Sequence, residues 1–145
     1  MTQDFHKHWL KVTAIVVGSF GPVFFLATMA ATAAPAAWTL DLVGWPLDGA
    51  QNFDAPTTRF MDALAGGFLI GWGALIWCLS DWVYDHAPDQ TRRAVVVGLL
   101  AWFLLDSAGS IISGNPWNVG FNLLVLLLAV GPLWVPARDA PAVNA

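Results

Sequence analysis

Two carboxylates stand inside stretches of the chain that are otherwise apolar enough to cross a membrane. Asp62 lies in MDALAGGFLIGWGALIW, and Asp106 lies in VVVGLLAWFLLDSAGSII. An ionised side chain at the centre of a bilayer costs about 2.5 kcal/mol or more, so such a residue is retained where it has a partner or a task. The two acids are therefore the first candidates for chemistry in this sequence.

Other polar residues recur at helical spacing around these acids. Residues three or four positions apart share one face of a helix, and the depth of each residue follows from a rise of about 1.5 Å per residue. Both considerations place one set of polar side chains in the outer third of the membrane, where we expect them to face inward. This predicted cluster comprises Arg59, Asp62, Asp106, Ser110, Asn118 and Asn122.

Two interpretations of the predicted cluster remain open. In the structural one, Arg59 neutralises Asp62 or Asp106, and the serine and asparagine side chains satisfy one another. In the functional one, the cluster binds a proton, a cation or a small polar ligand, because two acids face a single base. The first interpretation predicts an ion pair at Arg59, and the second predicts a ligand site.

The composition sets the class of protein. Of the 145 residues, 57% are hydrophobic and 11% are charged, which leaves too few charged groups to cover a soluble globule. A helix needs about 20 apolar residues to cross the hydrocarbon core, and four segments approach or exceed that length: residues 9–32, 60–82, 94–113 and 118–136. The sequence predicts an all-α integral membrane protein, with residues 1–145 forming one domain that folds as a four-transmembrane-helix bundle.

The basic residues indicate how this bundle is oriented. Most of them precede the first span, separate the second from the third or follow the fourth, namely Lys7, Lys11, Arg92, Arg93 and Arg138. Lysine and arginine are enriched in cytoplasmic segments of membrane proteins. We therefore expect a multi-pass protein of the bacterial inner (cytoplasmic) membrane with both termini in the cytoplasm.

The connection between the first two spans, residues 34–58, differs in charge from the inner segments. It carries three aspartates and no lysine or arginine, and it places Trp38 and Trp45 among those acids. Such a mixture is typical of a segment that lies along the membrane interface. We expect an amphipathic periplasmic connection that could act as a lid.

The first 34 residues also allow a second interpretation. A basic head, an apolar run from Val12 to Met29 and the Ala31-Thr32-Ala33 pattern resemble a cleaved secretory signal. The apolar run is longer than the roughly 7–15 residues of a usual signal core. This length favours a retained first span.

Small residues in the second span predict close helix packing. Gly67 and Gly71 form a GxxxG motif, and Gly66 and Gly73 flank it. Small residues at this spacing let two helices approach closely in lipid. We expect this face to pack within the molecule against the third or fourth span.

Other chemistry has little support in the sequence. His6, His8 and His86 lie outside the predicted spans, so we expect no haem and no metal site, and we expect His6 and His8 to form an interfacial tail. Cys78 is the single cysteine, and the chain contains no glutamate, no phosphate-binding loop and no serine, histidine and aspartate in register. No basic face is present to bind nucleic acid.

These observations favour a small non-catalytic protein over an enzyme. The first expectation is an accessory or assembly subunit of a larger inner-membrane complex, with membrane lipids, other subunits or further copies of itself as partners. The alternative is a small oligomeric carrier or channel for a proton, a cation or a small polar ligand, using Asp62 and Asp106. An enzyme that acts on lipid is a third possibility. No cofactor is expected, although a bound lipid is compatible with the sequence.

Overall fold

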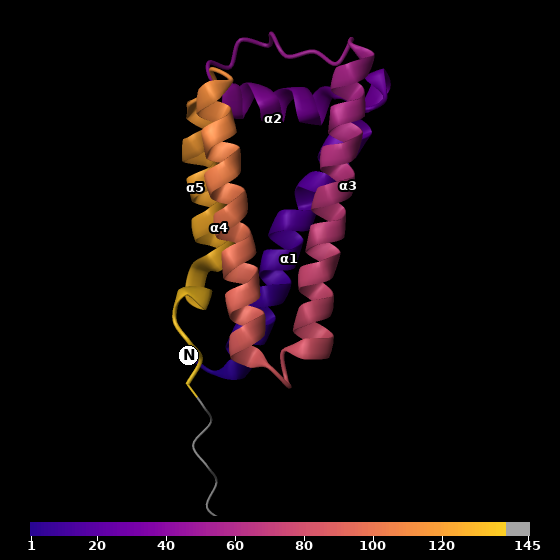
Figure 1. Ribbon diagram of the computed structural model, residues 1–145. Coiled ribbons are helices and arrows are strands. Elements are labelled where there is room, and N and C mark those ends of the chain that lie inside the picture. The colour runs from indigo at the N-terminus through magenta and orange to yellow at the C-terminus, as the bar shows by residue number, and fades with distance from the viewer. Residues whose placement is uncertain (139–145) are drawn as a thin grey trace, which may run out of the picture.

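The computed structural model describes residues 1–138, and this part of the chain is helical without any strand. Figure 1 shows long helices running side by side, with a shorter helix lying across one end. The main elements are α1 (Gln3–Leu26), α2 (Ala34–Gly44), α3 (Pro56–Cys78), α4 (Pro88–Ile112) and α5 (Trp117–Val130). Short helical turns η1 (Ala30–Thr32), η2 (Leu79–Val83) and η3 (Gly131–Trp134) extend or connect them.

Four helical segments in the described part of the chain are long and apolar enough to cross a membrane. They span Gln3–Leu26, Pro56–Val83, Pro88–Ile112 and Trp117–Trp134. The prediction of an all-helical chain with four segments of membrane-spanning character is therefore confirmed, and these segments indicate a multi-pass membrane protein.

The boundaries of the first segment differ from the sequence prediction. α1 begins at Gln3, six residues before the predicted start at residue 9, because the hydroxyl of Thr2 accepts a hydrogen bond from the Phe5 amide at 3.3 Å and caps the helix. α1 also ends earlier, at Leu26, where the Thr32 hydroxyl donates to the Leu26 carbonyl at 2.6 Å. Proline in the first turn starts α3 and α4, also ahead of the predicted boundaries.

The early start of α1 changes the position of His6. We expected this residue in an interfacial tail, but His6 lies on α1 and is completely buried. Both ring nitrogens lack a hydrogen-bond partner in the described structure. The interpretation of His6 as part of a tail is wrong, because the Thr2 cap draws the N-terminal residues into the helix.

Close packing joins α1 to α3. A side-chain carbon added at Gly66 would lie 2.7 Å from the Gly21 carbonyl oxygen, and one added at Gly73 would lie 2.7 Å from the Ala14 carbonyl oxygen. These separations are too short for any side chain, so the two backbones touch only because glycine is present. The second span therefore packs on the first, and the expected packing against the third or fourth span is wrong.

The GxxxG motif itself is not at this interface. A side-chain carbon added at Gly67 or Gly71 would have no neighbour within 4 Å. Positions 66 and 73 are separated by two helical turns and face the same side, whereas position 67 is turned by about 100° from position 66. Of the four predicted packing glycines, Gly66 and Gly73 contact α1, while Gly67 and Gly71 face open space.

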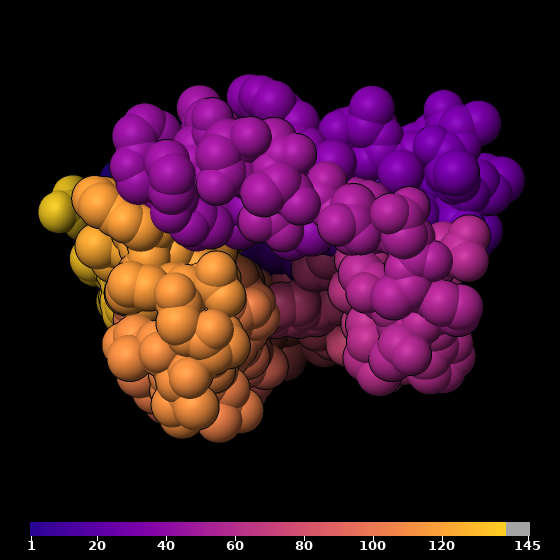
Figure 2. Space-filling view, turned by 90° about the horizontal axis from the view of Figure 1, so that it is seen from above, coloured from indigo at the N-terminus to yellow at the C-terminus, as the bar shows by residue number. Residues whose placement is uncertain are grey.

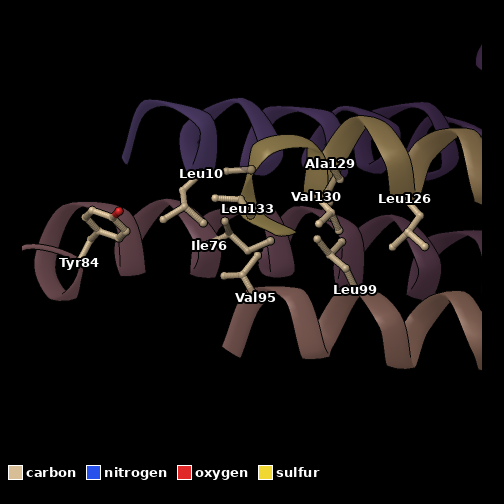
Figure 3. Close-up of a cluster of buried hydrophobic side chains, with 11 residues drawn as sticks. Leu10, Ile76, Tyr84, Val95, Leu99, Leu126, Ala129, Val130 and Leu133 are labelled. Carbon is tan, nitrogen blue, oxygen red and sulfur yellow. The ribbon is translucent and has the colours of Figure 1, made fainter. Parts of the chain in front are cut away.

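The main apolar core lies in the half of the molecule that contains the start of α1. Figure 3 shows buried side chains from all four long segments meeting there, among them Leu10, Ile76, Leu99 and Leu126. Toward the other end α3 and α4 diverge, and α2 crosses the space between them (Figure 1). The fold is thus closed by apolar packing at one end and is spread apart at the end that carries α2.

At the closed end, a buried arginine on α4 forms a hydrogen bond with η3. Arg92 is 8% exposed, and its Nη1 donates to the Leu133 carbonyl at 2.9 Å. Its Nε donates to Asp89 Oδ1 at 3.4 Å. The guanidinium therefore satisfies a carbonyl that would otherwise end η3 without a partner.

We predict that Arg92→Met lowers the free energy of unfolding by about 1–2 kcal/mol, because a hydrogen bond to a charged group is lost beside a buried carbonyl. Thermal unfolding in detergent measures this change. Arg93→Met is the matched control, since that side chain is 71% exposed and reaches Asp89 only at 3.9 Å. Equal effects of the two substitutions would contradict a specific role for Arg92.

Candidate functional site

Asp106 is the centre of a hydrogen-bonded network between α4 and α5. Its Oδ1 accepts from Asn122 Nδ2 at 2.7 Å, from Asn118 Nδ2 at 2.8 Å and from the Ser110 hydroxyl at 3.2 Å. Hydrogen bonds to a carboxylate are among the stronger ones in proteins. One oxygen of the carboxylate is therefore held firmly by three side chains.

The two asparagine amides of this network have no remaining donor capacity for a ligand. Asn118 Nδ2 also donates to Ser110 Oγ at 2.8 Å, and Asn122 Nδ2 also donates to Ser107 Oγ at 3.3 Å. An amide nitrogen has two protons, so both asparagines are fully used as donors. No side chain in residues 1–138 donates to the other carboxylate oxygen, Asp106 Oδ2.

The local sequence explains why these residues meet. Asp106 and Ser110 are four residues apart on α4, and Asn118 and Asn122 are four residues apart on α5, so each pair shares a helix face. Between them, Gly114 has a backbone φ of +84°, a conformation that glycine adopts without a steric penalty. The resulting turn folds α5 back along α4 and brings both pairs together.

The network borders a cavity of about 420 Å³ between the helices. Every main helix contributes to its wall, and most of the lining is apolar or aromatic. The lining residues with polar side chains are Thr39, Asp106, Asn118 and Asn122. Seen from the end that carries α2, the surface is hollowed between α3 and the α4–α5 pair (Figure 2).

The remaining polar lining residue does not supply a donor either. The Thr39 hydroxyl donates to the Pro35 carbonyl on its own helix at 2.8 Å. Its proton is therefore occupied within α2, and its oxygen can only accept. A molecule in the cavity would meet apolar surface, the acceptor oxygens of these residues and, as donors, the indole N–H groups of Trp72 and Trp102.

The predicted polar cluster is only partly assembled. Asp106, Ser110, Asn118 and Asn122 form the network, whereas Arg59 and Asp62 are absent from it and from the cavity lining. Asp62 is 8% exposed, and its Oδ2 has no hydrogen-bond partner in the described structure. It lies one turn before Gly66, the glycine that contacts α1.

Arg59 does not neutralise either acid. The ion pairs formed within residues 1–138 join other residues, and none includes Arg59, Asp62 or Asp106. The structural interpretation that relied on Arg59 is therefore wrong in its main contact. Its second part is correct for two pairs of side chains, because Asn118 donates to Ser110 Oγ and Asn122 donates to Ser107 Oγ.

The aromatic wall was missing from the sequence prediction. Six aromatic side chains line the cavity, namely Phe20, Phe24, Phe68, Trp72, Trp102 and Phe121. Two of them, Trp72 on α3 and Trp102 on α4, contact each other with ring centroids 6.3 Å apart. In the sequence these residues look like ordinary packing or lipid-facing residues, and only the arrangement of the helices makes them a wall.

Comparisons with known proteins give no relative from which a function could be transferred. No family model, no curated protein and no solved structure matches the chain. The function is therefore inferred from the chemistry of the cavity.

Proposed function

We propose that this chain is a non-catalytic membrane protein that binds and carries a cation or a small ligand with a hydrogen-bond donor at Asp106. The observation that supports this proposal is the free Oδ2 of a carboxylate that borders a cavity of about 420 Å³. A carboxylate at membrane depth needs a counter-charge or a proton. None of the cavity-lining residues in the described part of the chain is basic, so an external partner can take that place.

The same surroundings argue against catalysis. Ser107 and Ser110 are the hydroxyls beside Asp106, and no histidine lines the cavity. A serine nucleophile requires an adjacent base that takes its proton. The Ser110 proton goes to an Asp106 oxygen that also accepts from Asn118 and Asn122, so this hydroxyl is one of three groups that hold the carboxylate in place. This arrangement favours a binding role for the cluster.

The location of the protein is part of this proposal. The bacterial inner membrane, with both termini in the cytoplasm, is supported by the basic residues near the ends of α1 and α4. In this orientation α2 and the connection to α3 lie on the periplasmic side. The cavity would then lie in the outer half of the membrane.

The orientation predicts a specific labelling pattern. In a Cys78→Ala background, a cysteine at Gln51 should react with a membrane-impermeant thiol reagent added outside intact cells, and a cysteine at Gln90 should react only after lysis. Both positions are exposed in the structure, so burial does not limit the reaction. The reverse pattern would contradict the proposed orientation.

A second candidate function, an accessory or assembly subunit of a larger membrane complex, has one observation in its favour. Gly67 and Gly71 leave an open small-residue face on α3 that no other helix within residues 1–138 covers. A helix from another subunit could approach this face closely. Lipid can cover the same face, so this observation supports the subunit less strongly than the cavity supports ligand binding.

Extraction in a mild detergent separates the two candidates. The carrier predicts an isolated protein or homo-oligomer whose thermal stability rises with small ammonium ions, and predicts that Asp106→Asn removes this rise. Asp62→Asn is the matched control, because Asp62 is a buried acid that does not line the cavity. Stoichiometric larger partners, together with no ion-dependent stability at any pH tested, would contradict the carrier and support the subunit.

A further inference from the structure

We infer that the ligand of the Asp106 site is a lipophilic ammonium ion, meaning an apolar or aromatic body that carries a protonated amine with at least one N–H. This inference rests on the proposed function and adds the chemical class of the ligand. It follows from three properties of the cavity: its hydrogen-bonding groups, its charge and its wall.

The hydrogen-bonding groups around Asp106 favour a ligand that donates. The Nδ2 protons of Asn118 and Asn122 are bound within the network, and the Thr39 hydroxyl donates to a backbone carbonyl. What remains on these residues for a ligand is Asp106 Oδ2 and oxygen atoms of the two amides and the hydroxyl, all of which accept. Trp72 and Trp102 add neutral indole N–H donors, but no described lining side chain carries a positive charge, so a carboxylate or phosphate would leave its own charge unpaired.

The charge of the cavity selects a cation among the possible donors. Among the described lining residues, Asp106 is the one ionisable side chain, and no arginine, lysine or histidine accompanies it. A charge at membrane depth without a partner is costly, and a cationic donor compensates both the carboxylate and its own charge. An alcohol can donate to Oδ2 but leaves the negative charge uncompensated.

The wall selects a lipophilic ion over a hydrated one. Six aromatic rings and several aliphatic side chains face the cavity, and a volume of about 420 Å³ lies within the range of pockets that enclose small organic ligands. Aromatic faces attract ammonium groups, and the aliphatic wall gains from burying a hydrocarbon body. A hydrated metal ion would leave this apolar wall without contacts.

The position of the hollow fits entry from the membrane. Its walls include Phe68 and Trp72 from α3 and Trp102 from α4, the two helices that diverge toward α2 (Figures 1 and 2). A lipophilic amine concentrates in the bilayer before it binds. It can therefore reach Asp106 between α3 and α4 with its nitrogen toward the outer half of the cavity.

Three probes that share an unbranched alkyl chain and differ in their polar group test the ligand class. The protein in nanodiscs of a zwitterionic lipid is titrated at neutral pH with n-octylamine, n-octanol and n-octanoate, and binding is followed by tryptophan fluorescence and melting temperature. Trp72 and Trp102 line the cavity and should report occupancy. We expect octylamine to bind the wild type at least about tenfold more tightly than octanol, the effect of a charged over a neutral hydrogen bond.

Variants test the chemical class of the ligand and the role of Asp106 as the binding residue separately. Asp106→Asn keeps an oxygen for the network but removes the charge, and it should lose the preference for octylamine, whereas Asp62→Asn should keep it. Octanol or octanoate binding as tightly as octylamine, with a loss in Asp106→Asn, would overturn the ligand class and leave Asp106 as the binding residue. Identical responses of the wild type and Asp106→Asn to all three probes and to small ammonium ions would overturn the proposed function as well.

Discussion

Gly73→Leu should destabilise the protein by about 3 kcal/mol or prevent its folding. A side-chain carbon at this position would lie 2.7 Å from the Ala14 carbonyl oxygen and 2.9 Å from Gly18 Cα. Both atoms belong to the backbone of α1, so no side-chain rotation can relieve the overlap. Overpacking of well-packed sites costs about 1–3 kcal/mol and more where the backbone must move.

The matched control is Gly71→Leu on the same helix. A side-chain carbon there meets no atom within 4 Å, so its melting temperature should stay close to that of the wild type. Thermal unfolding of both variants in one detergent measures the difference. A wild-type melting temperature for Gly73→Leu would show that α1 and α3 do not touch at this point.

Asp106→Leu should lower stability by a similar amount, about 3 kcal/mol. The substitution removes the acceptor of three hydrogen bonds and leaves the donors of Asn118, Asn122 and Ser110 to find new partners. Each buried donor left without a partner costs about 1–3 kcal/mol, although hydrogen bonds between membrane helices average only about 0.6 kcal/mol. Asp106→Asn should retain most of the stability, because an amide oxygen can replace Oδ1.

Replacing Asp62 by leucine should not lower the free energy of unfolding, in contrast to the same replacement at Asp106. The Oδ2 of Asp62 is buried without a partner, so Asp62→Leu should leave stability unchanged or raise it, since a buried polar group without a hydrogen bond is unfavourable. Unfolding by heat or denaturant in the same detergent measures both leucine variants. A larger loss for Asp62→Leu than for Asp106→Leu would show that Asp62 has a partner and that the Asp106 network is weak.

The sequence was sufficient to predict the class of fold and much of the network around Asp106. Hydropathy identifies the four long apolar helices, since the hydrocarbon thickness fixes the number of apolar residues that a span requires. Helical spacing on both sides of the Gly114 turn brings Asp106, Ser110, Asn118 and Asn122 together. Such short-range geometry needs no knowledge of the other helices.

Long-range partners could not be predicted in the same way. Depth in the membrane places Arg59 and Asp62 at a level similar to that of Asp106, but depth does not specify the direction in which each helix face turns. The rotation of α3 about its own axis depends on the fit of Gly66 and Gly73 against α1. This fit turns Gly67 and Gly71 away from α1 and leaves Asp62 outside the cavity lining.

The cavity wall depends on the same long-range arrangement. Its aromatic residues come from α1, α3, α4 and α5, and each is unremarkable within its own segment. α2 lies within the 34–58 connection, for which the sequence predicts an amphipathic segment and a possible lid, and it contributes Thr39, Leu40 and Val43 to the lining. The chemical character of the site therefore emerges only once five helices are placed together.

A distance measurement inside the complex tests the binding of an amine at Asp106 most directly. Solid-state NMR with ¹⁵N-octylamine and protein labelled with ¹³C at the aspartate side-chain carboxyls reports the separation of the two nuclei. Binding to Oδ2 predicts one carboxyl carbon within about 4 Å of the nitrogen, as a charge-assisted hydrogen bond requires, and loss of that signal in Asp106→Asn but not in Asp62→Asn. Saturating amine without any close aspartate carbon, or with a close carbon that persists in Asp106→Asn, would contradict the role of Asp106.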